Sequence, residues 1–182
     1  MICLSRAATL WRDCFSLKHS NTSKKGRPLK KPGARLSKAT LKRTAERLQF
    51  SNPVNHFGFV LQEAAQGRAV FRMPVLELHK QSQKVVHGGV LAMLADTAGG
   101  FAAFLAAPPH SRVVTIEMKI NFLEAVANGE ITAYARVIRA GRSVSVVDCE
   151  IIDHNRLLVC KALMTFAIIP PKLQQQARRK NR

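Results

Sequence analysis

Residues 85–107 read VVHGGVLAMLADTAGGFAAFLAA, and this stretch decides the fold of the chain. It is apolar almost throughout, with one carboxylate, Asp96, near its middle. An ionised carboxylate is costly in apolar surroundings, so we expect Asp96 to have a functional role. Gly88 and Gly89 stand at the start of the predicted helix, where glycines leave backbone N–H groups approachable. An acid near exposed amides indicates acyl chemistry.

The same stretch is long enough to raise the question of a membrane span, since about 20 apolar residues cross a bilayer. Four glycines and the central Asp96 argue against a span, as do the strand-like segments that follow. We therefore predict a buried core helix that starts near Gly88 and ends before Pro108-Pro109, and no transmembrane segment.

Segments with strand character lie on both sides of this helix. Phe57–Ala64 and Arg68–Val75 flank a Gln66-Gly67 turn and predict a hairpin, and a short helix capped by Ser37 runs to about Phe50 before it. Four more strands are predicted after the helix: Arg112–Phe122, Glu130–Ala140, Ser143–Asp153 and Leu157–Ile168. The fold class is therefore α+β, an antiparallel β-sheet wrapped around one long central α-helix.

Side-chain periodicity predicts which faces of these elements are buried. Leu41, Ala45 and Leu48 fall on one side of the first helix. In the first strand after the long helix, apolar and polar residues alternate. The predicted inner face holds Val114, Ile116, Met118, Ile120 and Phe122, and the outer face holds Thr115, Glu117, Lys119 and Asn121.

The net charge of +18 is concentrated at the two ends of the chain. Residues 1–50 hold 13 Lys and Arg against 2 acids, residues 170–182 hold 5 against none, and residues 51–169 hold 11 against 9. A nucleic-acid module carries its positive charge on the folded domain itself. We therefore expect no dedicated nucleic-acid partner.

Three regions follow from this composition. Residues 1–36 are predicted to be a basic, disordered extension or a targeting segment, 37–169 the folded domain and 170–182 a basic tail. An amphipathic, acid-poor start is typical of a transit peptide, and a plain basic extension or an upstream start codon explains it equally well. The four cysteines lack metal-type spacing and are expected to be reduced, as in a soluble protein of the cytoplasm or mitochondrial matrix.

The long helix has two faces by spacing. Val90, Leu94, Phe101 and Leu105 form the stripe expected to face the sheet, and Ala92, Asp96, Gly99, Gly100 and Ala103 form a second face of small residues. Asp96 lies eight residues beyond Gly88, or about 12 Å along the axis. One carbonyl group cannot easily touch both. If both serve one reaction, a second copy of the helix supplies one of them, which predicts a homodimer with sites at its interface.

The motif His87-Gly88-Gly89, followed after six residues by Asp96-Thr97-Ala98-Gly99-Gly100, resembles hotdog-fold acyl-CoA thioesterases of the PaaI-like, phenylacetate-pathway branch. The segment 114–122, VTIEMKINF, resembles the strand that follows the helix in that family. The resemblance covers roughly residues 45–169. It implies hydrolysis of an acyl-CoA by a homodimer or a dimer of dimers.

The resemblance also implies roles for individual residues. Asp96 corresponds to the general base or nucleophile and Gly88 to the oxyanion-hole amide, with His87 as a positioning residue. Gln81 would place water or the carbonyl, and Thr115 would approach from the partner subunit to orient the water. Residues implied in substrate or coenzyme A binding are Gly89, Gly141, Arg142 and Ser143.

Three positions depart from the family pattern. Gln81 stands where many relatives have Asn, Lys84 where many have Gly, and Leu123-Glu124-Ala125 replaces a commoner Leu-Arg-Pro. These differences affect substrate class and the binding of coenzyme A rather than Asp96 and the glycines.

Two other functions stay open beside the thioesterase. One is a non-catalytic acyl-CoA binder that acts as a regulator through its basic tails. The other is a dehydratase, which needs a His and an Asp poised together, whereas His87 and Asp96 are nine residues apart. The scattered histidines lack ligand spacing, so we expect no metal and no cofactor.

Overall fold

The computed structural model describes residues 36–174, so the predictions for residues 1–35 and 175–182 lie outside the described part of the chain. Helices α2 and α3 come first and the long helix α4 lies between the second and third strands. The helices are α2 (Lys38–Gln49), α3 (Asn52–His56), the 3₁₀ turn η1 (Glu77–His79) and α4 (Gly88–Ala106). The strands are β1 (Val60–Ala65), β2 (Arg68–Pro74), β3 (Arg112–Phe122), β4 (Glu130–Ala140), β5 (Val144–Asp153) and β6 (Leu158–Ile169).

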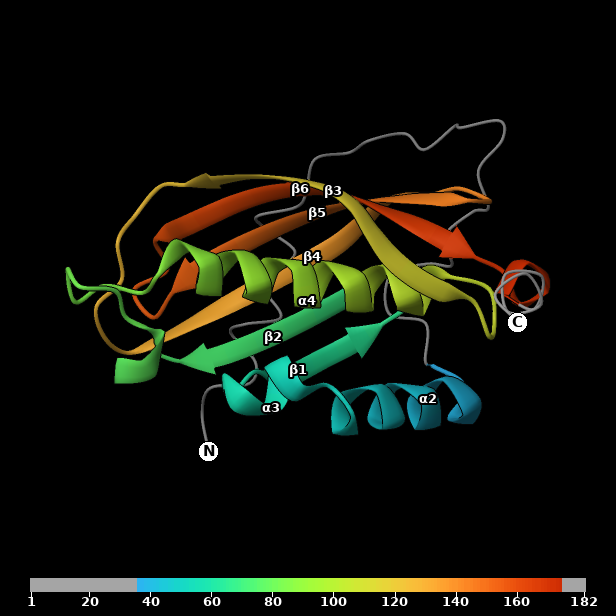
Figure 1. Ribbon diagram of the computed structural model, residues 1–182, viewed down its shortest axis with the longest axis horizontal. Coiled ribbons are helices and arrows are strands. Elements are labelled where there is room, and N and C mark those ends of the chain that lie inside the picture. The colour runs from blue at the N-terminus through green and yellow to red at the C-terminus, as the bar shows by residue number, and fades with distance from the viewer. Residues whose placement is uncertain (1–35, 175–182) are drawn as a thin grey trace, which may run out of the picture.

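All six strands form one antiparallel sheet in the order β1-β2-β4-β5-β6-β3. The sheet curves around α4, which lies across its concave face (Figure 1). This confirms the α+β architecture predicted from the sequence, including the β1–β2 hairpin. Gly67 in its turn has a φ of 75°, a left-handed conformation that favours glycine. Strand β3 is an edge strand, and this position matters for the site below.

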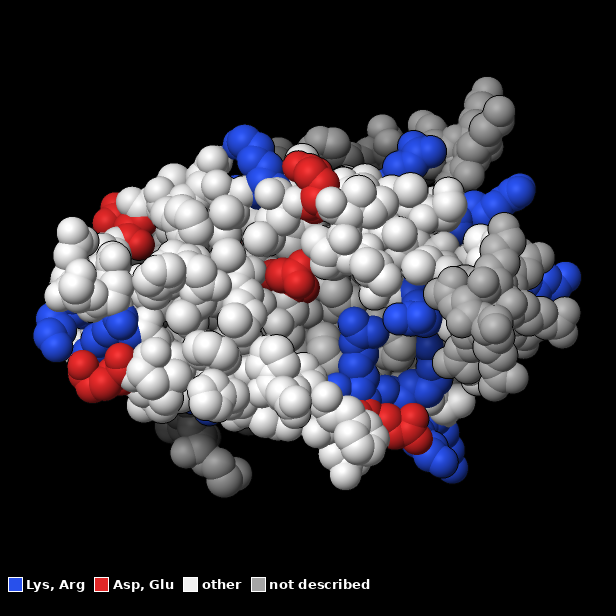
Figure 2. All heavy atoms as spheres, in the orientation of Figure 1, with Lys and Arg blue, Asp and Glu red and all other residues white. Residues whose placement is uncertain are grey.

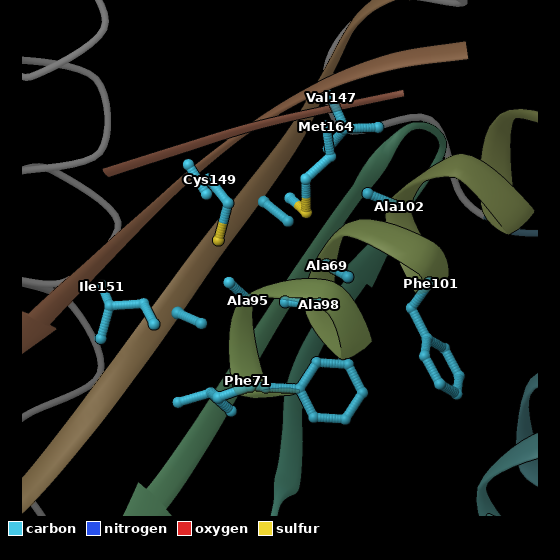
Figure 3. Close-up of a cluster of buried hydrophobic side chains, with 14 of the residues drawn as sticks. Ala69, Phe71, Ala95, Ala98, Phe101, Ala102, Val147, Cys149, Ile151 and Met164 are labelled. Carbon is cyan, nitrogen blue, oxygen red and sulfur yellow. The ribbon is translucent and has the colours of Figure 1, made fainter. Parts of the chain in front are cut away.

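The core lies between α4 and the sheet. Small α4 side chains at Ala95, Ala98 and Ala102 lie against Phe71 and Met164 of the sheet (Figure 3). All five are fully buried. Alanines let the helix axis come close to the strands, and the larger sheet side chains fill the space that remains. Helix α4 is long and apolar enough to cross a membrane, but 72% of its apolar window is buried inside the protein, as expected for a core helix.

Strand β3 contains a β-bulge that the sequence did not reveal. Its register against β6 shifts between Thr115 and Glu117, so Ile116 is an extra residue. Alternation therefore inverts at this point. Val114 and Ile116, predicted to face inward, are 44% and 59% exposed, and Thr115 faces α4 instead of the outer surface.

Helix α2 also differs from its prediction. Ser37 caps it as expected, accepting a hydrogen bond of 3.1 Å from the Thr40 amide. Of its predicted apolar side only Leu48 packs against the core, because Leu41 is 52% exposed and Ala45 is exposed, whereas Thr44 is buried. The short helix α3, with a proline in its first turn, was not predicted at all.

Candidate active site

Helix α4 leaves one stripe of its surface open, and this stripe is confined to its first half. Every α4 residue from Ala98 to Ala106 is buried. In the first half Gly89 is exposed and its neighbours on the same stripe are half-buried. The open stripe consists of Gly88, Gly89, Ala92, Met93, Asp96 and Thr97. Asp96 therefore lies at the end of an accessible helix face, about 12 Å along the axis from Gly88.

Asp96 has one side-chain partner in the described part of the chain. The hydroxyl of Thr115 donates to its Oδ1 over 2.7 Å. The bulge in β3 makes this contact possible, because it turns Thr115 toward α4. Both groups of this contact belong to the same chain, and the approach of Thr115 from the partner subunit, which the resemblance implies, stays a prediction. The bond fixes one carboxylate oxygen and leaves Oδ2 free to meet a substrate or water.

The start of α4 is capped by the residue just before it. His87 Nδ1 accepts a hydrogen bond of 2.9 Å from the Gly89 amide, and the His87 carbonyl accepts from Val90 and Leu91. The amide of Gly88 has no hydrogen-bond partner within residues 36–174. Of the two glycine amides that the sequence marks as bare, only that of Gly88 is bare. It is the positive end of the helix dipole that an oxyanion can reach.

The segment before α4 carries Gln81 and ends at the cap. The Gln81 amide donates to the Val85 carbonyl and its carbonyl accepts from Lys84, which closes a tight turn. Lys84 has a φ of 63°, and this left-handed conformation explains why a glycine suits that position. The His87 amide donates to the His79 carbonyl, so this segment holds the cap and the half-buried Gln81 in one unit.

The turn Gly141-Arg142-Ser143 lies at the opposite end of α4. Gly141 and Arg142 line a cavity of about 200 Å³ together with Ala103, Ala106 and Pro108. The Gly141 amide donates to Val144 and the Ser143 carbonyl accepts from Ile168, which fixes the turn. The 19 residues of α4 span about 27 Å. In one chain this turn and Gly88 are therefore a whole helix length apart.

The face of small residues predicted on α4 divides between two surroundings. Gly99 faces the sheet, where an added Cβ would lie 2.5 Å from Met164 Cε. Gly100 lies between the sheet and α2, where an added Cβ would lie 3.6 Å from Phe166 Cε1 and 4.0 Å from Arg47 Nη2. Gly99 and Gly100 are thus covered by β6 and α2 and are not part of the open surface that carries Asp96.

Arg43 and Arg47 are polar residues beside the site that the sequence did not single out. The Arg47 guanidinium lies 5.2 Å from the ring centre of Phe101 and 5.1 Å from that of Phe104. Arg43 lies 4.7 Å from the Phe104 ring centre. Their spacing of four residues on α2 is the one signal that places both on the same helix face. In Figure 2 basic side chains gather beside α2, next to an acidic group over α4.

The residues from Leu36 to Gln174 contain no group of three or more His, Cys, Asp or Glu side chains close enough to hold a metal ion. The site therefore combines one hydrogen-bonded carboxylate, one free helix amide, and a second group of basic and aromatic side chains. These features, on a sheet wrapped around a helix, define the hotdog class of acyl-processing proteins.

Comparison with known proteins agrees with this class. The model of the Thioesterase superfamily matches residues 83–160. A putative esterase of Saccharolobus solfataricus is 37% identical over 109 residues, covering 60% of this chain and 77% of the relative. A 1,4-dihydroxy-2-naphthoyl-CoA hydrolase of Listeria monocytogenes is 31% identical over 111 residues, covering 61% and 90%. The chain belongs to the Thioesterase superfamily.

Solved structures show the same fold. The Pseudomonas aeruginosa protein PA5202 superposes with a TM-score of 0.65 and is 34% identical, covering 69% of this chain and 99% of its own. The Escherichia coli PaaI protein, from the phenylacetic acid degradation operon, superposes with a TM-score of 0.69 at 25% identity, covering 75% and 97%. The resemblance to a PaaI-like hotdog protein is thereby confirmed.

Proposed function

We propose that the protein is a thioesterase that hydrolyses an acyl-CoA to a free acid and coenzyme A at sites shared by two subunits. The observation that carries the proposal is the position of Asp96. It is oriented by Thr115, lies on the open half of α4, and is about 12 Å along the helix from the free Gly88 amide. Substrate contact with both groups requires a second chain.

In the proposed reaction Asp96 acts as general base or as nucleophile on the thioester carbon. As a base, it takes a proton from water while the water oxygen bonds to the carbonyl carbon. The Gly88 amide of the other subunit donates to the oxyanion that forms. The C–S bond then breaks, and the proton held by Asp96 passes to the leaving sulfur. Gln81 is proposed to hold the water or the carbonyl. His87, which caps the helix through the Gly89 amide, is proposed to hold the neighbouring Gly88 amide in place.

Two features support the proposed dimer. Strand β3 is an 11-residue edge strand whose unpaired backbone groups can bond to a second sheet. Large apolar side chains are exposed along it and just beyond it, at Ile116, Phe122 and Leu123. An isologous pairing of this edge would bring the open stripes of two α4 helices together.

The relatives support the residue assignments and the substrate class. Crystal structures of Staphylococcus aureus SAV0944, 27% and 26% identical, carry a glutamate or a glutamine replaced, fifteen positions apart. Gln81 and Asp96 are also fifteen apart. The Listeria monocytogenes relative named above is a CoA thioester hydrolase by name. In the proposed dimer the Gly141-Arg142-Ser143 turn would bind the coenzyme A phosphate.

The wider organisation of the chain is also a proposal. We place the thioesterase domain at residues 37–169, between a basic N-terminal segment at 1–36 and a basic tail at 170–182. The compartment, cytoplasm or mitochondrial matrix, depends on whether the N-terminal segment is a targeting signal. The Gly89 amide already donates to His87. Gly89 would therefore contribute to substrate binding because it has no side chain, which lets the substrate approach the backbone, and not through its amide.

The experiment is a hydrolysis screen over short, long, branched and aromatic acyl-CoAs, with wild type and Asp96→Asn. We expect turnover on at least one substrate, lowered about 10²–10⁴-fold by Asp96→Asn, because the isosteric amide cannot take up a proton. Size-exclusion chromatography should show the same oligomer for both proteins. Equal turnover by Asp96→Asn, or an oligomer with no thioester turnover on any substrate, would overturn the proposal.

A further inference from the structure

A basic cleft lies between α2 and the second half of α4, and no step of the proposed hydrolysis uses it. Its volume is about 640 Å³. It is lined by Arg43, Glu46, Arg47, Phe50, Ser51 and Phe104. Two guanidinium groups and one carboxylate give it a net positive charge.

The two arginines are held in place but not paired with an acid. Both guanidinium groups stack on the ring of Phe104, and both side chains are half-buried. Neither guanidinium forms an ion pair or a hydrogen bond with another group among residues 36–174, although Glu46 lines the same cleft. Stacked guanidiniums present their edges with the N–H donors in a fixed fork, which matches the two oxygens of a carboxylate. The cleft is therefore preorganised for an anion.

The cleft meets α4 at Phe104, and one of its arginines reaches back along the helix toward the open stripe. Arg47 Nη2 lies over Gly100, one helical turn or about 6 Å along the axis beyond Asp96. The negative charge of Asp96 raises the pKa of Arg47 against the larger lowering by burial, so the two groups lie within electrostatic range. They are not in ion-pair contact, and Asp96 bonds to Thr115 instead. An anion bound to Arg47 would therefore lie about one helical turn along α4 from a thioester at Asp96.

The short distance between Asp96 and Arg47 distinguishes two anions that could bind there, a coenzyme A phosphate and a carboxylate on the acyl chain. The phosphates of coenzyme A are joined to the thioester sulfur by the long pantetheine arm, so an extended molecule cannot place one a single helical turn from Asp96. A second cavity flanks the end of α4 and has Arg142 in its lining, and this guanidinium is the group proposed above to bind the phosphates. A carboxylate at the far end of a short acyl chain has the right reach for Arg47.

We propose that the cleft selects acyl-CoAs whose acyl group ends in a carboxylate, the monothioesters of short dicarboxylic acids, with Arg47 as the binding residue and Arg43 beside it. The proposal rests on the proposed thioesterase function and adds its substrate class. Phe104 and Phe101 hold Arg47 in position. Asp96 then contacts the thioester end of the acyl chain, and Arg47 binds the carboxylate at its other end.

The test compares substrates of equal chain length that differ only at the far end: glutaryl-CoA against pentanoyl-CoA, and adipoyl-CoA against hexanoyl-CoA. We expect kcat/KM to favour the carboxylated member of each pair in the wild type. Arg47→Met keeps the apolar stem over the two rings but removes the donors, and should lower this preference about tenfold or more. Lys42→Met removes one positive charge from the exposed side of the same helix and should leave the preference as it is.

Binding gives a second readout that does not depend on turnover. Calorimetric titration of Asp96→Asn protein should show glutaryl-CoA binding more tightly than pentanoyl-CoA, and Arg47→Met in that background should abolish the difference. Equal values for both members of each pair in the wild type would overturn the inference while leaving thioesterase activity intact. A uniform rise in KM for all CoA esters in Arg47→Met would also overturn it, because the cleft would then bind coenzyme A phosphates.

Discussion

The two halves of α4 have similar sequences but opposite surroundings. In the first half a stripe from Gly88 to Asp96 is open, because no element of the described chain covers it. In the second half α2 covers the same stripe and places Arg47 over Gly100. Asp96 lies at the boundary. Under the proposed function, the open half carries the reaction and faces a second subunit, and the covered half holds groups in place.

Apart from the loss expected for Asp96→Asn, the largest effect is expected at the start of the open half. Gly88→Pro removes the one free amide of the helix, and should lower kcat about 10²–10³-fold if that amide binds the oxyanion. Proline is favoured at the first helical position, and His87 has the extended φ and ψ of −64° and 134° that a residue before proline needs. Steady-state kinetics on the best acyl-CoA measures the change.

Gly88→Ala is the matched control for this variant. Both substitutions place a Cβ about 3.3 Å from the Phe122 ring, but alanine keeps the N–H. Alanine should therefore retain most of the activity that proline loses. Equal losses in the two variants would assign the effect to crowding against Phe122 and not to the amide.

Adjacent glycines in the covered half separate a tight contact with the sheet, at Gly99, from looser packing between the sheet and α2, at Gly100. Gly99→Ala should destabilise the fold, since its Cβ would lie 2.5 Å from Met164 Cε and 3.1 Å from Phe166 Cζ, and Met164 is fully buried. Gly100→Ala meets only ordinary contacts and gains helix propensity. We expect the free energies of unfolding in urea to differ by about 1–3 kcal/mol. A less stable Gly100→Ala would show that the space around Gly100, between Phe166 and Arg47, is tighter than described.

A smaller effect concerns the segment that leads into the open half. Burial lowers the pKa of His79, and backbone carbonyls of Phe57 and Pro74 oppose this only in part. Its Nδ1 accepts the Leu76 amide over 3.1 Å, so protonation would break that bond. The pKa of His79 in the folded protein lies below its value in the unfolded chain, which is about 6.5. The contribution of His79 to the free energy of unfolding is therefore complete above about pH 6.5 and declines as the pH falls toward the pKa of the folded protein.

Urea midpoints at pH 7.5 and pH 5.5 measure this decline. His79→Gln should make the midpoint less dependent on pH, because glutamine does not titrate and its carbonyl can still accept from Leu76. His56→Gln, on an exposed side chain, should keep the wild-type dependence. If His56→Gln flattened the profile and His79→Gln did not, the assignment to His79 would be wrong.

Much of the fold could be predicted from the sequence because its signals are local. The bounds of β3 and β4 were predicted to the residue, and Gly88 and Pro108 mark the two ends of α4. Period and turn residues decide such features within one segment. The resemblance to hotdog thioesterases then supplied the class, which the comparisons confirmed.

What the sequence missed depends on contacts between distant segments. The bulge at Ile116 inverts the alternation of β3 and turns Thr115 toward Asp96, yet an uninterrupted alternation is what the sequence shows. Arg43 and Arg47 read as ordinary solvated charges on a short helix. Their stacking on Phe104 exists only because α2 folds back over α4, and one helix's periodicity does not reveal its neighbour.

The central claim is that each site takes Asp96 from one subunit and Gly88 from the other, and mixed dimers test it directly. Subunits carrying Asp96→Asn are co-expressed with subunits carrying Gly88→Pro, and the mixed dimer is purified with two different tags. Each parent has no intact site. If the sites are shared between chains, the mixed dimer holds one intact site of two and should recover about half of the wild-type kcat per dimer. A mixed dimer no more active than its parents would contradict the account, because both groups would then have to come from the same chain.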